Sequence, residues 1–155
     1  LDTKLLTVSP KDLAVAYGDI LNKGLKSKFY PMFNVTDDTL RTTIAAERKS
    51  QGGNADVSVT YSDLQGTGPV AFAAQNAGAI VAVQMNEVAT FTPLNNRDLK
   101  LTGAIKALAG LEISNRVIRA TYGVQLFFYV PPVGSSQLIQ VLGYSENLTG
   151  VKAQQ

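Results

Sequence analysis

Apolar and polar residues alternate with a period of two through most of residues 99–130. In the first part of this run the apolar residues stand at odd positions, and after Ser114 and Asn115 they stand at even positions. A period of two is typical of a β-strand with one buried face, because successive side chains point to opposite sides of a sheet. Two such runs around a polar turn predict one long antiparallel hairpin, with strands about twice the usual length.

The hairpin interpretation assigns individual side chains to the two faces. The exposed face is expected to carry Lys106, Glu112 and Arg119, and the buried face to carry Ile105, Leu111, Tyr122, Leu126 and Phe128. The competing interpretation is a helix over residues 101–111, because Ala104, Leu108 and Leu111 fit a helical spacing.

Further segments are predicted to be strands. Residues 55–61 and 79–91 alternate in the same way, and only Glu87 interrupts the apolar phase of the second segment. Residues 29–35 and 137–144 are also predicted as strands, the former at an edge or a strand start because it contains Pro31. Residues 70–77 fit either a strand or a short helix.

The clearest helix signal begins at Ser9, a good N-cap residue that precedes Pro10 at the first helical position. The helix should run to about Lys26, with an apolar stripe at Leu13, Tyr17, Ile20, Leu21 and Leu25. Residues 40–49 favour a second helix that Gly52 and Gly53 would end, although their alternation also fits a strand.

Together these elements predict an α+β fold in a single domain over residues 1–155. The N-terminal helix is expected to pack on a long-stranded, strongly curved antiparallel β-meander, which would be a half-barrel or barrel-like. A chain of 155 residues is long enough to bury a substantial core.

The residue types that are absent exclude several kinds of chemistry. The chain contains no Cys and no His. It therefore has no disulfide or thiolate ligand, and it lacks the commonest general base and transition-metal ligand. We expect no catalytic residues, no metal and no cofactor.

Charge and hydropathy bear on the partners. A net charge of +2 is too small to indicate nucleic acid, and Lys23, Lys26 and Lys28 are interpreted as a solvated helix end. No apolar stretch reaches the roughly 18 residues of a membrane helix, so no membrane span is expected. The compartment stays open, with a periplasmic, extracellular or virion setting favoured.

Three features could carry binding or catalysis. Asp37 and Asp38 offer oxygen ligands for a hard cation, but their position before a predicted helix favours a role at the helix start. The glycine-rich stretches 51–54 and 66–69 lack phosphate-binding spacing and are interpreted as turns. Glu87 is either a buried carboxylate lining a cavity or the mark of a β-bulge or register slip, and we favour the latter.

The most useful functional hint is aromatic. Phe127 and Tyr129 stand in the phase opposite to Phe128, so the strand is apolar on both faces near residues 126–130. Such a strand is either central and covered on both sides or in contact with a partner. We expect Phe127 and Tyr129 to form an interface.

The sequence favours a non-enzymatic structural subunit that self-associates in a larger complex, such as a bacterial envelope machine, a filament or a virus particle. Its partners would be copies of itself, and other subunits of that complex are a further option. The alternative is a small apolar-ligand-binding α+β barrel domain. An enzyme that relies on Asp, Glu, Tyr or Lys is a third hypothesis.

Overall fold

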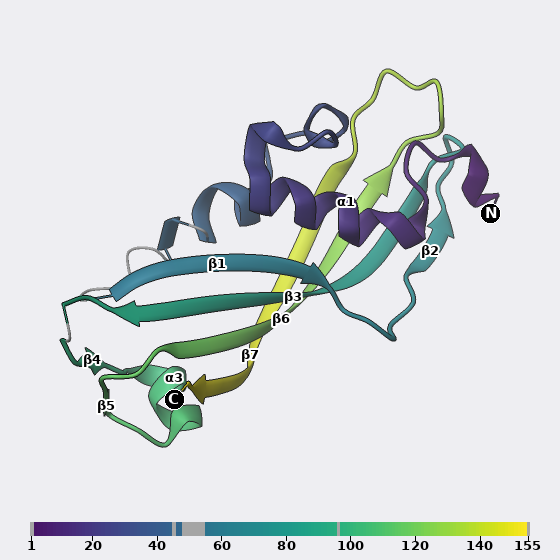
Figure 1. Cartoon of the computed structure of the whole chain (residues 1–155). Helices are drawn as coiled ribbons and strands as arrows, with labels where there is room; N and C mark the ends of the chain where they lie inside the picture. The colour runs from purple at the N-terminus through teal and green to yellow at the C-terminus, as the bar shows by residue number, and fades with distance from the viewer. Residues whose placement is uncertain (1, 45, 48–54, 96, 155) are drawn as a thin grey trace.

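The computed structural model describes residues 2–44, 46–47, 55–95 and 97–154. It is an α+β fold in which helix α1 (Pro10–Lys23) lies across an antiparallel sheet (Figure 1). This confirms the predicted class. The strands of the main sheet are β1 (Ala55–Asp63), β2 (Val70–Ala73), β3 (Ala79–Pro93), β6 (Ile118–Val130) and β7 (Gln140–Ala153).

Smaller elements complete the chain. Helix α3 (Gly103–Ala109) lies near the C-terminus, beside a two-stranded ribbon of β4 (Leu99–Lys100) and β5 (Ile113–Ser114). A π-helical turn covers Leu40–Ile44, and short 3-10 turns are found at Thr3–Leu5, Gly24–Lys26 and Tyr30–Met32.

The strand order of the main sheet is β1-β3-β6-β7, and every pairing is antiparallel. Strand β2 pairs with the beginning of β3, and β1 pairs with the later part of β3, so that β1 and β2 share one side of it. Within the described residues β1 and β7 are not paired with each other, so the sheet is open. Figure 1 shows β7 running at a steep angle to β1, as the twist of long strands requires.

The sheet has an inner face that helices cover and an outer face of different character. On β3 the residues at odd positions from Ala79 to Phe91 are buried, and on β6 those at even positions from Ile118 to Val130 are buried. Leu13, Tyr17 and Ile20 of α1 belong to the same core as these inner residues. Helix α3 packs on a second cluster of inner-face residues, through Ile105 and Ala109.

Helix α1 forms as its sequence predicts. The Ser9 side chain accepts a hydrogen bond from the backbone N–H of Asp12, and Pro10 occupies the first turn. Gly24 ends the α-helix at a positive φ of 56°, and a 3-10 turn continues to Lys26. A Cβ on Gly18 would lie only 3.0 Å from the Cε of Met85, so this glycine lets α1 approach β3 closely.

The predicted hairpin over residues 99–130 is wrong in its first half. Strand β6 confirms the second half, but residues 103–109 form α3, the competing interpretation. Gly103 and Gly110 flank this helix at positive φ, a conformation that a strand does not use. The helix places Ile105 and Ala109 on its packed side, four residues apart.

Because residues 103–109 form a helix, some side chains that the hairpin interpretation placed on the buried face are not buried. Leu111 is exposed and Ile105 is only half-buried, against expectation. Tyr122, Leu126 and Phe128 are buried as predicted, and the exposed positions are confirmed for Lys106, Glu112 and Arg119.

Other predicted elements also changed. Residues 29–35 are not a strand, because Pro31 sits inside the 3-10 turn Tyr30–Met32. Residues 70–77 fitted either a strand or a short helix, and the structure has a strand over Val70–Ala73. The helix expected at residues 40–49 begins as the π-helical turn Leu40–Ile44. The glycine-rich stretch 51–54 and residues 48–49 lie outside the described residues. Strand β7 begins at Gln140 and is longer than the predicted 137–144.

Packing of α1 on the sheet predicts the effect of two matched truncations. Leu13→Ala removes a fully buried side chain and should lower the free energy of unfolding by roughly 2–5 kcal/mol. Val15→Ala removes apolar atoms from the same helix at a position that is 54% exposed. It should change the free energy of unfolding by less than about 0.5 kcal/mol. Chemical denaturation measures both, and equal effects would contradict the described burial of α1.

Candidate functional site

The outer face carries an apolar surface at the end of the sheet that contains β2. We call it the outer patch. It consists of two neighbouring rows of cross-strand partners, with Phe72, Ile80 and Tyr129 in one row and Val70, Ala82 and Phe127 in the other. Partners that lie directly opposite each other share a face of the sheet, so the patch spans β2, β3 and β6.

Several of these side chains are strongly exposed. Phe72 is 65% exposed, and Phe127 is 48% exposed. Val70 and Ile80 are also among the exposed large hydrophobic residues, while Ala82 and Tyr129 are half-buried. Aromatic and branched residues thus lie side by side on one exposed face, which makes this patch the candidate functional surface.

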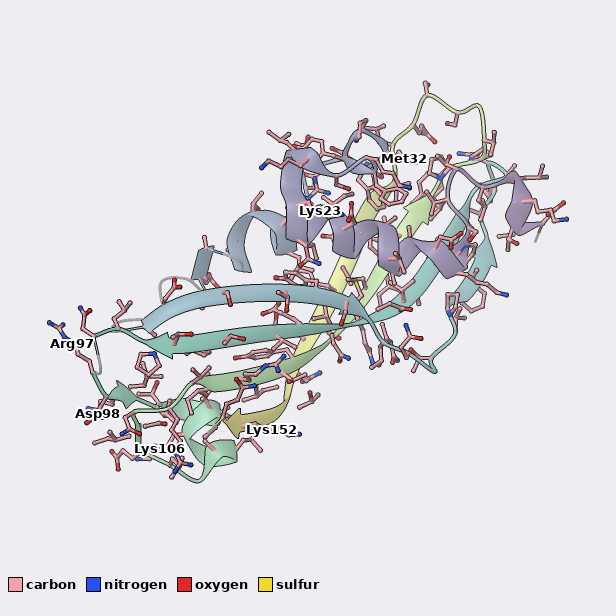
Figure 2. The ribbon with its side chains drawn as sticks, in the orientation of Figure 1. Lys23, Met32, Arg97, Asp98, Lys106 and Lys152 are labelled. Carbon is pink, nitrogen blue, oxygen red and sulfur yellow. The ribbon has the colours of Figure 1, made fainter. Side chains whose placement is uncertain are left out.

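Charged residues are scarce in the segments that build this end of the sheet. Residues 64–95 contain one charged residue, Glu87, and residues 120–145 contain none. Figure 2 shows Arg97, Asp98, Lys106 and Lys152 at the opposite end, around α3. On the outer face the row beyond the patch is Gln84, Gln125 and Ser145, which is polar and uncharged. Depletion of charge is the compositional mark of an interface core.

Both residues expected at an interface lie in this patch, in different environments. Phe127 projects from β6 with no large partner on β7, because Gly143 is opposite it. Tyr129 packs closely against Gly78, where an added Cβ would meet its ring and hydroxyl at 2.9 and 2.8 Å. Its hydroxyl also donates to Oε1 of Gln137 at 3.2 Å. Tyr129 therefore supports the local fold as well as the surface.

The sequence interpretation missed Val70, Phe72 and Ile80 as members of this surface. Ile80 stands with Ala82 and Val88 in the outer phase of a strand whose other aliphatic and aromatic residues lie in the inner phase, and a large aliphatic residue in that outer phase was the available signal. Phe72 comes beside Ile80 only through the pairing of β2 with β3.

Glu87 is fully buried on the inner face, and the bulge interpretation is wrong. The register of β3 runs without a shift on both sides, with Glu87 opposite Tyr61 on β1 and opposite Tyr122 on β6. Each of these three residues has an interaction partner. Glu87 thus lies between the two apolar clusters of the core, and neither of the two clefts described below includes it in its lining.

A second buried carboxylate, Asp38, belongs to a polar cluster beneath α1. The Tyr17 hydroxyl donates to Oδ1 and Oδ2 of Asp38 at 2.7 and 2.8 Å, and Arg41 Nη2 lies 3.2 Å from Oδ2. The backbone N–H of Arg41 donates to Oδ1 of Asp38, which places this carboxylate at the start of the π-helical turn as expected. Burial and the nearby Asp38 carboxylate raise the pKa of Tyr17 above its ordinary value of 10.0.

Two clefts on the described part of the chain are defined by their linings. One, of about 200 Å³, is lined by Asn34, Asp37, Asp38 and the first residues of β7. The other, of about 240 Å³, lies between the start of α1 and the loop before β2, and Thr67, Gly68 and Pro69 of the 66–69 stretch line it. Asp38 is already engaged by Tyr17 and Arg41, and the described side chains form no acidic group suited to a metal ion.

The lysines interpreted as a helix end are exposed. Lys23 pairs with Asp19 one turn earlier in α1, and the Nζ of Lys28 lies 4.9 Å above the Phe29 ring. No helix in the described part of the chain is long and apolar enough to cross a membrane.

No protein-family model matches this chain, and no curated protein and no solved structure matches it either. The outer patch therefore has to be interpreted from its own chemistry.

The buried hydrogen bonds of Tyr17 generate a stability prediction. Tyr17→Phe should lower the free energy of unfolding by about 1.5–3 kcal/mol at neutral pH, because it removes a donor to a buried carboxylate. Tyr30→Phe is the matched control, since the ring of Tyr30 also faces Arg41 but its hydroxyl has no hydrogen bond among the described residues. A smaller loss in Tyr17→Phe than in Tyr30→Phe would contradict this role of Asp38.

The raised pKa of Tyr17 also predicts how the stabilities of the parent and of Tyr17→Phe depend on pH. A tyrosine whose pKa is higher in the folded state stabilises the fold below the unfolded pKa of about 10, and this contribution declines at higher pH. The free energy of unfolding of the parent should therefore fall more steeply above pH ~10 than that of Tyr17→Phe. Denaturation at a series of alkaline pH values measures the slope.

Proposed function

We propose that this chain is a non-enzymatic subunit that self-associates through the outer patch. The observation that carries the proposal is the exposure of Phe72 and Phe127 within a surface whose own six residues carry no charge. Exposed aromatic side chains on a sheet face are stabilised when apolar area is removed from water.

A second copy fits this surface better than a charged partner does. The patch offers no ionic group that would select an oppositely charged protein. Two β-sheets pack well face to face when each presents branched and aromatic side chains, as Val70, Ile80 and Phe127 are presented here. A two-fold contact of this kind uses the same surface on both copies.

The alternative function, a barrel that binds a small apolar ligand, remains a prediction, as does the strongly curved, barrel-like form that would go with it. It requires an enclosed apolar space. The two clefts of the described residues have polar groups in their linings, such as Asp37 and Gln140 in one and Lys11 and Asp63 in the other. Self-association is favoured because the exposed aromatic residues lie on the outer face.

Paired serine substitutions test self-association through the patch. Phe72→Ser with Phe127→Ser should shift the native mass of the protein toward that of a monomer, with the parent measured at the same concentration. These two residues are chosen over Tyr129 because Tyr129 also packs against Gly78. The measurement is analytical ultracentrifugation or light scattering over a concentration series.

Leu25→Ser is the matched control for the loss of exposed apolar area. Leu25 is 79% exposed in the 3-10 turn after α1, away from the outer face. It should leave the native mass unchanged. A parent that stays monomeric at high concentration, or a double variant that associates as the parent does, would overturn the proposal.

A further inference from the structure

Strand β7 is an edge strand with an open central stretch. Among the described residues β6 is its only strand partner, and none of the residues in Gln140–Ala153 is fully buried. At its start the edge is flanked by the chain around Asn34, whose backbone N–H donates to Ile139. Toward its end α3 packs against residues that include Leu148 and Val151.

The opposite edge of the sheet is closed by a side chain. Asn22 of α1 accepts a hydrogen bond from the backbone N–H of Tyr61 and donates one to its C=O, both at 2.8 Å. The amide thus takes the place of a neighbouring strand on β1. Acidic residues, Asp56 and Asp63, also lie near the two ends of β1. These are devices that keep an edge strand from pairing with another chain.

In the described part of the chain, no side-chain amide closes the centre of β7 as Asn22 closes β1. Residues 143–148 form a regular run between two bulges, which leave Leu142 and Thr149 without partners on β6. Within this run the one charged residue is Glu146, which is half-buried on the inner face, and there is no Pro. On a regular edge stretch of low charge, the backbone groups that point away from the neighbouring strand form a template for another strand.

We propose that β7 pairs with β7 of a second copy, antiparallel about a two-fold axis at Ser145. The proposal rests on the self-association proposed above and adds a second contact to it. The second copy is the favoured occupant because the open run is self-complementary, as its possible registers demonstrate.

Alternation of faces limits the registers of such a pair. Residues that lie opposite each other must share a face, so the axis has to pass through a residue and not between two residues. Axes at Ser145 and at Glu146 give the longest overlap of the regular run. The axis at Glu146 would place two carboxylates directly opposite each other, which is destabilising.

The axis at Ser145 gives chemically compatible partners. Tyr144 of each copy lies opposite Glu146 of the other on the inner side, and Gly143 lies opposite Asn147 on the outer side. A carboxylate has several acceptor sites, so Glu146 can accept from a tyrosine hydroxyl beside the interaction it already has. The two Ser145 side chains face each other on the outer side.

The absence of cysteine makes this register directly testable. Ser145→Cys introduces a single thiol at the two-fold axis, and mild oxidation should link most of the dimeric protein through this residue. Ser58→Cys is the matched control, because Ser58 is an exposed outer-face serine on the other edge strand, β1. Its cross-linking should be at least about tenfold slower.

Charge at the same position gives a second, reversible test. Ser145→Lys places like charges opposite each other and should weaken self-association by roughly tenfold or more. Mixing the Ser145→Lys and Ser145→Glu variants should restore it, because opposite charges then face each other. Ser58→Lys should leave the native mass unchanged. Recovery on mixing also separates a lost contact from a damaged fold.

The outcomes distinguish the two proposals. If Phe72→Ser with Phe127→Ser lowers the native mass but Ser145→Cys links no faster than Ser58→Cys, the edge contact is overturned and the outer patch stands. If Ser145→Lys and Ser145→Glu do not recover on mixing, the two-fold at Ser145 is overturned. A parent that is monomeric at high concentration and does not cross-link overturns both.

Discussion

The structure depends on one geometric constraint: a β-strand places alternate side chains on opposite faces, and the helices of this chain pack on one of them. Helix α1 packs on the inner face through Leu13, Tyr17 and Ile20, and α3 packs on it farther along. Every inner position of β3 and β6 must therefore fit a dry core. The side chains at the outer positions do not have to fit this core, so their polarity and size can serve binding at the surface.

This constraint explains how two buried carboxylates can exist in one core. Glu87 and Asp38 both lie on the covered side of the sheet, where an ionised group without partners would be very unfavourable. Asp38 is satisfied by the Tyr17 hydroxyl, the Arg41 guanidinium and a backbone N–H. The arrangement ties α1 to the turn at Leu40–Ile44, so this polar cluster fixes the position of the helical layer over the sheet.

The sequence predicted elements wherever one face is fully buried. Strands β1, β3 and β6 and helix α1 were found because burial enforces a period in each of them. Strand β7 was predicted only in part: as an edge strand it buries no residue fully, so its pattern is weak. Helix α3 was only the competing interpretation, because Ile105, Ala107 and Ala109 satisfy a period of two. The glycines at its two ends favour the helix.

The outer patch was partly predictable, because the period of a strand assigns its own side chains to faces but does not show which strands are neighbours. Phe127 could be placed on the outer face from the phase of its own strand, whereas Phe72 could not, because its position depends on the pairing of a short strand with β3. Glu87 shows the opposite error. A charge in an apolar phase suggested a local defect, but the strand kept its register and buried the carboxylate between two tyrosines.

The two edges of the sheet differ in a way that the burial of a core does not explain. The Asn22 amide places a polar side chain of α1 on the edge of β1, where it satisfies the backbone N–H and C=O of Tyr61. An unprotected β1 would compete with β7 for any incoming strand. In the association that we propose, protection of one edge directs pairing to the other edge, so that the hydrogen bonds of Asn22 serve specificity as well as stability.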